Sequence, residues 1–206
     1  MKNPLGYQTT EYDCGPTTII NAIRHLFRRE DIYPEVLKSI MLYSLDAYDS
    51  KGESGKSGTS TMAMLFLSSW LNQFGQVKHF PIHCDFLSGK EVTVSQNSKI
   101  TVALQQGGVV VVRLMYGVWH YALLTGIKDN NIYLFDPYYR TRPFKETDIK
   151  LITTQPNKAN RVVSVDRLND IGAGYYMMGD ADTREAVILF NTDTRKTPDR
   201  SIEYFI

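Results

Sequence analysis

The first third of the chain carries apolar residues at helical spacing. In residues 15–29, Ile, Leu and Phe recur every three or four positions and so form one apolar face of a helix. Two further helices are predicted at 34–43 and at 60–74, the latter closed by Gly75. A polar, glycine-rich loop at 46–60 joins these two helices.

The remainder of the chain carries short apolar runs bounded by turn residues, which is typical of strands. Such runs are found at 77–84, 91–94, 109–114, 119–127, 132–135, 174–178 and 186–190. Asp129-Asn130-Asn131 predicts a hairpin between 119–127 and 132–135, and a second hairpin is expected from the last two runs. One short helix is expected at 99–106. A chain whose first part forms helices and whose second part forms antiparallel strands is predicted to have an α+β fold.

Composition narrows the class of protein. The chain has 206 residues, of which 43% are hydrophobic, which is enough for one globular domain spanning 1–206. Lys and Arg number 23 and Asp and Glu 22, so the formal net charge is +1. This balance gives no electrostatic reason to expect binding to nucleic acid or to an anionic membrane.

Two cysteines, Cys14 and Cys84, are too few for a disulfide framework. The first residues lack the apolar core of a signal peptide, and the apolar runs are too short to span a bilayer. We therefore expect a soluble, cytoplasmic protein whose thiols are reduced, so that Cys14 is free to react.

Cys14 immediately precedes the first predicted helix, so it should lie at the helix N-terminus, with Asp13 as a candidate cap. A helix N-terminus favours the reactive thiolate form of cysteine. Gly15 would leave backbone room beside the sulfur for a substrate. The N–H of Cys14 would point at an oxyanion formed there, and the side-chain amide of Gln8 can supply a second donor.

A nucleophilic thiol needs a base, and the chain has four histidines. His25 lies nearly three helical turns from the cysteine, and His79 and His83 lie in a predicted strand of their own. His120 begins one apolar run of the hairpin, and the other run ends at Asp136. Pairing of the two strands should bring His120 and Asp136 to the same end, where the carboxylate can accept the Nδ1–H of the ring.

Three motifs in this order resemble a known family. Gln8 lies six residues before the cysteine of Asp-Cys-Gly-Pro-Thr, His120 opens His-Tyr-Ala-Leu-Leu-Thr-Gly-Ile, and Asp136 lies in Phe-Asp-Pro. Together, over about residues 7–137, they resemble the bacteriocin-leader (double-glycine) cysteine peptidases of the papain-like superfamily. The resemblance implies a papain-like fold with Cys14 as nucleophile, His120 as base, Asp136 as the group that orients the base, and Gln8 in the oxyanion hole. We therefore expect a thiol-dependent hydrolase that cleaves a peptide or amide bond and needs no cofactor or metal.

The chain also departs from that family. It has neither the membrane spans nor the nucleotide-binding domain of the transporter-linked members, and residues 138–206 extend past the usual end. We expect this extension to complete or cap the sheet. The extension and the 46–60 loop are both candidates for determining specificity, and the family's double-glycine preference is therefore not assumed.

Other interpretations compete with this one. Cys14 taken alone is more simply a buried structural cysteine, and an Asp-Pro at a strand end is common in turns. An acyl-enzyme can also pass its acyl group to an amine or thiol, and a non-catalytic module can retain the groove alone. The glycine-rich sequence 52–57 lacks the spacing of a P-loop, and His79, His83 and Cys84 offer too few ligands for zinc.

Overall fold

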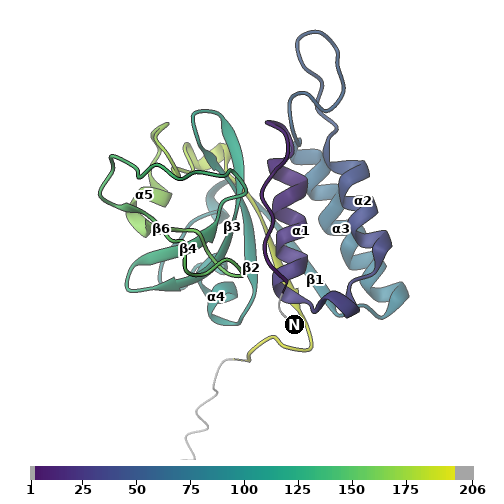
Figure 1. Ribbon diagram of the computed structural model, residues 1–206. Helices are drawn as coiled ribbons and strands as arrows, with labels where there is room; N and C mark the ends of the chain where they lie inside the picture. Colours follow the sequence, from purple (N-terminus) through teal and green to yellow (C-terminus); the bar gives the residue numbers. More distant parts are fainter. Residues whose placement is uncertain (1–2, 198–206) are drawn as a thin grey trace, which may run out of the picture.

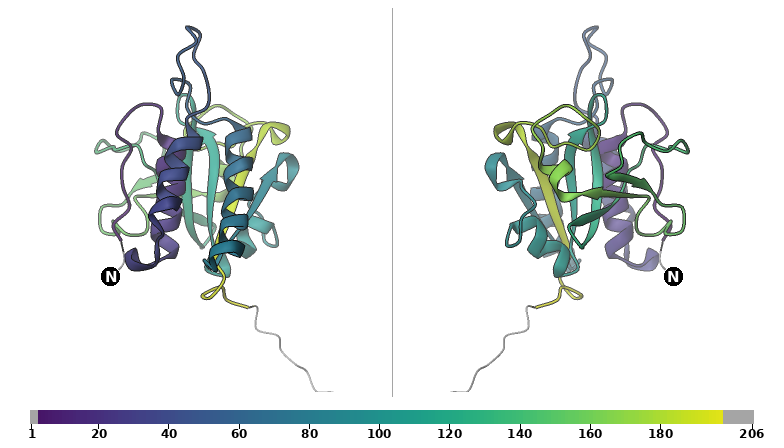
Figure 2. Two further views of the ribbon diagram at one scale, coloured as in Figure 1. Left: turned by 90° about the vertical axis from the view of Figure 1, so that its right-hand side faces the viewer. Right: turned by 90° about the vertical axis from the view of Figure 1, so that its left-hand side faces the viewer.

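Three long helices form one layer of the protein. The computed structural model describes residues 3–197. The two ends of the predicted domain, residues 1–2 and 198–206, lie outside the described residues. α1 (Cys14–Leu26), α2 (Pro34–Ser44) and α3 (Thr61–Lys78) pack together on one side of a sheet (Figures 1 and 2). α1 begins one residue before its predicted start and ends three residues before its predicted end, and α2 matches its prediction to within one residue. No helix in residues 3–197 has the length and apolar character needed to cross a membrane.

A sheet of seven strands, antiparallel throughout, forms the next layer of the described residues. The strands are β1 (Ile82–Ser88), β2 (Val109–Met115), β3 (Trp119–Lys128), β4 (Asn131–Phe135), β5 (Ile149–Leu151), β6 (Arg161–Ser164) and β7 (Glu185–Asn191). Their spatial order is β1-β7-β2-β3-β4-β6-β5. The predicted α+β class, with N-terminal helices packed on an antiparallel sheet, is confirmed.

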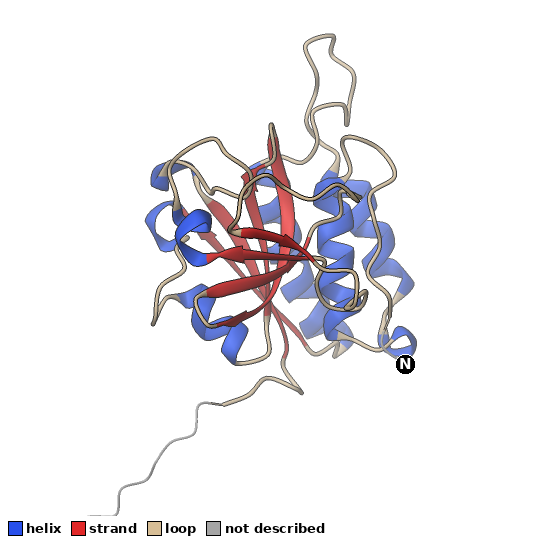
Figure 3. Cartoon of the chain, turned by 60° about the vertical axis from the view of Figure 1, so that its left-hand side comes forward, coloured by secondary structure: helices blue, strands red, loops and turns tan. Residues whose placement is uncertain are grey.

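Shorter helices cover the other face of the sheet (Figure 3). They are α4 (Lys99–Gln105), at the predicted place, and α5 (Val165–Asn169), which has no counterpart in the prediction. Three short 3-10 helices complete the described elements: η1 (Arg29–Asp31), η2 (Gly89–Glu91) and η3 (Ala181–Thr183).

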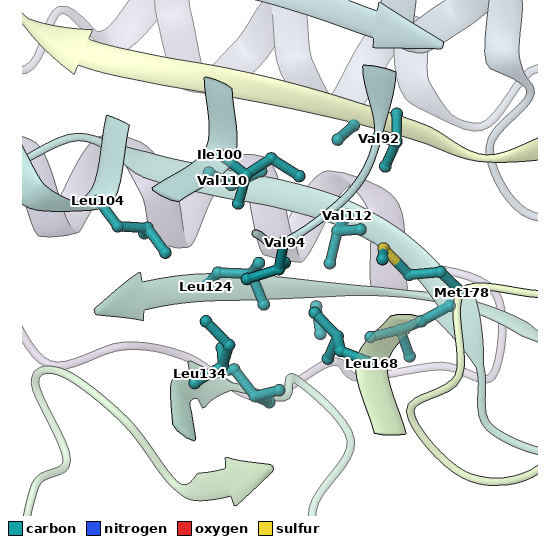
Figure 4. Close-up of a cluster of buried hydrophobic side chains, with 14 of the residues drawn as sticks. Val92, Val94, Ile100, Leu104, Val110, Val112, Leu124, Leu134, Leu168 and Met178 are labelled. Carbon is teal, nitrogen blue, oxygen red and sulfur yellow. The ribbon is translucent and has the colours of Figure 1, made fainter. Parts of the chain in front are cut away.

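The two faces of the sheet carry two separate apolar cores. Along β2, Val109 and Val111 pack in the core beneath α1, α2 and α3. Val110 and Val112 point the other way, into the core closed by α4 and α5 (Figure 4). Successive side chains of a strand alternate between faces, so a run of four valines is the pattern that a sheet covered on both sides requires.

The end of the third helix was wrongly predicted. α3 continues through Gly75 to Lys78 and ends at His79, whose φ of 53° is left-handed. A Cβ placed on Gly75 would lie 2.9 Å from the carbonyl oxygen of Phe80. The glycine therefore allows the returning chain to pack closely on the helix and does not end it, although both roles select the same residue.

Three predicted strand runs also differ from the structure. The run at 77–84 is divided between the last turn of α3 and the start of β1, and 91–94 is a 3-10 turn followed by irregular chain that buries Val92 and Val94. The run at 174–178 is a loop, so the predicted second hairpin does not form. Its other half, β7, pairs with β1 and β2 instead.

The 46–60 loop projects from the end of the molecule at which α1 begins (Figures 1 and 2). At its base, the carboxylate of Asp46 accepts hydrogen bonds from the N–H and the hydroxyl of Ser60, at 2.9 and 2.5 Å. A β-bridge between Tyr48 and Ser54 joins its two sides. These contacts hold the base of the loop and its two sides together beside the start of α1.

Candidate active site

Cys14 is the first residue of α1, as predicted, and is 8% exposed. Asp13 occupies the cap position, but its side chain does not bond to the helix N–H groups. Its carboxylate accepts instead from the N–H groups and hydroxyls of Thr9 and Thr10, at 2.8 to 3.0 Å. Burial alone would raise the pKa of Asp13, but these four hydrogen bonds lower it. Asp13 therefore orders the chain before the cysteine, leaving the first N–H groups of α1 uncapped.

Gly15 does not provide the open space that its place beside the sulfur predicted. A Cβ at this position would lie 2.1 Å from Oγ1 and 2.7 Å from Cβ of Thr59. Thr59 is the last residue of the loop before Ser60 caps α3. The glycine thus lets the stem of the 46–60 loop pack directly against the residue that follows the cysteine, and the loop becomes a wall of the site.

The segment before α1 is fastened at two points. The buried amide of Asn21 both accepts from the N–H of Gly6 and donates to its carbonyl, each at 2.8 Å. The N–H of Gln8 then donates to the carbonyl of Pro137, at 2.9 Å. Gln8 is thereby held between α1 and the residue that follows Asp136.

The side chain of Gln8 is already engaged within this segment. Its Nε2 donates to the carbonyl of Thr10 at 2.8 Å, while its Oε1 is buried without a hydrogen-bond partner among the described residues. An amide nitrogen carries two hydrogens, so one N–H remains to donate elsewhere. Gln8 lies where the sequence placed it, but the geometry does not by itself aim this N–H at Cys14.

His120 is brought to Cys14 by a tie between helix and strand. One turn into α1, the hydroxyl of Thr18 donates to the carbonyl of Tyr121 at 3.0 Å, and both residues are buried. Thr18 is four residues after Cys14, and Tyr121 is the residue after His120. The thiol of Cys14 is near enough to the imidazole of His120 to help raise the pKa of the ring.

Asp136 meets His120 because of a β-bulge. Next to the turn, β3 and β4 pair in one register, from Lys128↔Asn131 to Gly126↔Tyr133. Thr125 is then left without a paired residue, and the register beyond it is shifted by one residue, to Leu124↔Leu134. Without the shift, Asp136 would lie opposite Leu123 and face away from His120, because successive strand residues alternate between faces. With it, Asp136 follows in register opposite Ala122, on the same face as His120.

The two residues form a close, buried pair. Nε2 of His120 lies 2.7 Å from Oδ1 of Asp136, and their side chains are 6% and 0% exposed. The contact was predicted for Nδ1, so that detail was wrong, and Nδ1 is the ring nitrogen that does not bond to Asp136. Burial opposes a charged ring, but the carboxylate and the neighbouring sulfur outweigh it and raise the pKa of His120 to about 10.

Asp136 is held by more groups than the sequence predicted. Besides His120, its carboxylate accepts from the N–H of Tyr138 at 2.7 Å and from the hydroxyl of Tyr176 at 2.6 Å. The side chain of Asn160 bonds to both the N–H and the carbonyl of Asp136, at 2.8 Å each. Burial alone would raise the pKa of Asp136, but His120, Tyr176 and the nearby charge of Arg161 lower it. Nothing in the local sequence around 160 or 176 marks these partners, which reach the site only through the fold.

A second buried carboxylate bonds to the residue that follows His120. Glu185, at the start of β7 and 2% exposed, accepts hydrogen bonds from the hydroxyls of Tyr121 and Thr61. Nε of Arg113 lies 3.7 Å away. Burial, then Glu185, raises the pKa of Tyr121 well above its usual value, so the phenol stays protonated and able to donate. This cluster joins β2, β3, β7 and the start of α3.

The remaining histidines lie apart from this site. His79 ends α3, and the ring of His83 bonds to Asp85 at the surface, at 3.1 Å. The thiol of Cys84 is buried, and burial raises its pKa. Within residues 3–197 no group of three His, Cys, Asp or Glu side chains is arranged to hold a metal ion.

Comparison with known proteins relates this fold to solved structures. No protein-family model matches the sequence, and no curated protein matches it significantly. The peptidase domain of Streptococcus mutans ComA aligns with 91% of this chain and 98% of its own, at 13% identity and a TM-score of 0.43. The peptidase domain of Streptococcus ComA, a bifunctional ABC transporter involved in quorum sensing, aligns with 91% of this chain and 96% of its own, at 14% identity and a TM-score of 0.46.

A third similar structure is a double-glycine motif protease from an AMS/PCAT transporter, solved in complex with the leader peptide. It aligns with 91% of this chain and 89% of its own, at 10% identity and a TM-score of 0.45. These peptidase domains are of the kind that the sequence motifs resemble.

Proposed function

We propose that the protein is a thiol-dependent hydrolase, a cysteine peptidase that cleaves a peptide or amide bond through an acyl-enzyme. The observation that supports this most directly is the ring of His120, which bonds to Asp136 through Nε2 and whose pKa is raised by that carboxylate and by the neighbouring sulfur of Cys14. A thiol, an imidazole and a buried carboxylate in this order are the groups that nucleophilic catalysis by cysteine requires.

In this mechanism His120 takes the proton of Cys14 and leaves a thiolate beside an imidazolium. The sulfur attacks the carbonyl carbon of the substrate, and the imidazolium gives its proton to the departing amine as the C–N bond breaks. Water then attacks the thioester while His120 takes one of its protons, and the acid leaves as the proton returns to sulfur. Asp136 keeps its charge throughout and orients the ring.

The oxyanion of the tetrahedral intermediate would form beside the N-terminus of α1. The uncapped N–H of Cys14 and the remaining N–H of Gln8 are the proposed donors. Removing one such donor commonly costs about 100-fold or more in kcat. Because one N–H of Gln8 is bound to Thr10, its side chain would donate to the oxyanion with the other.

Exposed aromatic side chains adjoin these residues and favour an extended peptide as substrate. Tyr7 precedes Gln8, Trp119 precedes His120, and the N–H of Tyr138 bonds to Asp136; their side chains are 44%, 42% and 44% exposed. Such rings offer apolar contact area at low entropic cost, and their polar atoms can bond to a peptide backbone.

Alkylation by iodoacetamide near pH 6 tests the activated thiol. The variant Cys84→Ala keeps only the thiol of Cys14, and Cys14→Ala keeps only the buried thiol of Cys84. At a pH where ordinary thiols are almost wholly protonated, Cys14 should react at least about tenfold faster than glutathione. His120→Gln should remove that advantage. A rate for Cys14 equal to that of glutathione would exclude the proposed mechanism.

Hydrolysis is separated from acyl transfer by the products. A peptide library is incubated with the wild type and with Cys14→Ala, with and without glycinamide as an added amine, and analysed by mass spectrometry. Cleavage to free carboxylates that requires Cys14 supports a peptidase. Products that carry glycinamide in preference to water would instead support an acyltransferase.

A further inference from the structure

Tyr176 is a buried residue in an unusual backbone conformation. It is 0% exposed, and its φ of 62° lies in the left-handed region, which an aromatic residue rarely adopts. Its N–H donates to the carbonyl of Met115 at 2.7 Å, and the N–H of Met115 donates to the carbonyl of Met177 at 2.8 Å. The loop that contains Tyr176 is thereby fastened to the end of β2, directly before the turn that leads to His120.

The direction of the hydrogen bonds at the Tyr176 hydroxyl is fixed by its neighbours. Nε of Arg161 donates to the hydroxyl oxygen at 3.0 Å, and a guanidinium has no acceptor. The single hydrogen of the hydroxyl must therefore go to its other partner, Oδ2 of Asp136, at 2.6 Å. Oδ1 remains for His120 and for the N–H of Tyr138. Each carboxylate oxygen has its own donors, and the plane of the carboxylate is defined.

Arg161 supplies positive charge without touching the carboxylate. It is 2% exposed, and its other nitrogens donate to the carbonyls of Asn160 at 3.0 Å and Tyr138 at 3.2 Å. The phenol of Tyr176 thus stands between a buried cation and a buried anion. A direct ion pair would compete with His120 for the carboxylate, whereas a neutral hydroxyl between the two charges does not.

We propose that Tyr176, backed by Arg161, is the positioning residue that holds Asp136 ionised and correctly turned toward His120 in the proposed reaction. This inference rests on the proposed function, because a positioning role has meaning only if His120 acts on Cys14. It gives the chain segment around 161–176, which lies beyond the region of family resemblance, a direct part in the site.

The variant Tyr176→Phe keeps the ring and removes the hydrogen bond. The charged and titratable groups around Asp136 are His120, Arg161, Tyr116 and Tyr176 itself. Without the phenol as donor, the carboxylate should take up a proton at higher pH and release its hold on His120. The acid side of the pH profile for Cys14 alkylation should move up by about one pH unit, so that at a fixed pH on that acid side the rate falls by up to about tenfold.

Tyr133→Phe is the matched control. Tyr133 lies on β4, three residues before Asp136, and its hydroxyl bonds to no residue in the described part of the chain. Both variants are made in the Cys84→Ala background, and urea unfolding establishes that each is folded. The pH profile of Tyr133→Phe should match that of the parent protein.

A second change at position 176 strengthens the hydrogen bond to Asp136 instead of removing it, so the proposal can still be tested if Tyr176→Phe does not fold. Site-specific 3-fluorotyrosine at position 176 is a more acidic phenol and a stronger donor, so it should move the acid side of the profile to lower pH. Shifts of opposite sign for the two changes support the proposal. Profiles unchanged by both would reduce Tyr176 to a packing residue and overturn it. If Cys14 of the parent protein alkylates no faster than glutathione, it is the proposed function itself that fails.

Discussion

The charged ring of His120 should make the stability of the protein depend on pH in a way that can be isolated. The pKa of His120 is about 10 in the folded protein, against 6.5 for an ordinary histidine. The folded state therefore keeps a proton that the unfolded chain releases above about pH 6.5. The stabilisation is complete below that value and is lost as the pH rises toward 10.

Linkage gives the magnitude. When a group is protonated in the folded state and not in the unfolded state, the free energy of unfolding falls by about 1.4 kcal/mol for each unit by which the pH rises. At about pH 6.5 half of the histidine in the unfolded chain is still protonated, so the full slope develops only above that pH. Between about pH 6.5 and pH 8.5 the free energy of unfolding should therefore fall by about 2 kcal/mol. Since His120 and Asp136 are almost fully buried, solvent screens this pair little.

The measurement is made on Cys14→Ala, because an ordinary thiol titrates near pH 8.5 and would overlap. This variant keeps Asp136, which contributes more than the sulfur to the raised pKa of His120. Urea unfolding at several values between about pH 6.5 and 8.5 gives the slope for this protein and for the same protein with His120→Gln. The added substitution should remove about 2 kcal/mol of pH dependence, whereas His83→Gln, which breaks a half-exposed pair with Asp85, should leave the slope nearly unchanged. Equal slopes with and without His120 would refute the conclusion that the ring is held charged.

Two further predictions concern the chain around the thiol. Gly15→Ala should destabilise the protein by about 1 to 3 kcal/mol, since its Cβ would overlap Thr59, and Thr59→Gly should restore most of the loss; urea unfolding of the single and double variants checks this. Asp13→Ala should lower stability by about 2 kcal/mol at neutral pH, as Thr9 and Thr10 lose their acceptor. Because the pKa of Asp13 is lowered in the folded protein, its contribution is present above the unfolded value of 3.8 and is lost as the pH falls below it, so thermal melting of the two proteins should converge in acid.

Local periodicity was sufficient for the elements that are made from neighbouring residues. The helix after Cys14, the helix after Pro34 and the turn at Asp129 and Asn130 are encoded within a few residues each, and both turn residues have the positive φ that a two-residue hairpin needs. The order of the motifs placed a thiol, a histidine and a carboxylate on those elements. Their convergence in space then required the correct pairing of one hairpin.

Long-range features of the site could not be predicted in the same way. Gly126, a glycine inside a predicted strand, is compatible with a bulge but does not establish one, and without the one-residue shift at Thr125 Asp136 would face away from His120. Tyr176 reaches Asp136 only because a loop with a left-handed residue returns across the end of β2. Such contacts depend on the packing of the whole chain, and the sequence pattern around each residue is compatible with several alternatives.

The place of β7 in the sheet has a consequence for how the protein is made. β1 pairs with β7 alone, roughly 100 residues further along the chain, and β7 also borders β2. While a ribosome is still synthesising the segment before Glu185, β1 has no partner strand and one edge of β2 is open. The residues proposed for catalysis have all been synthesised by then, but the sheet that supports them is unfinished. The nascent chain therefore passes through a stage in which β1 is unpaired and one edge of β2 is open, and chaperones are expected to act at that stage.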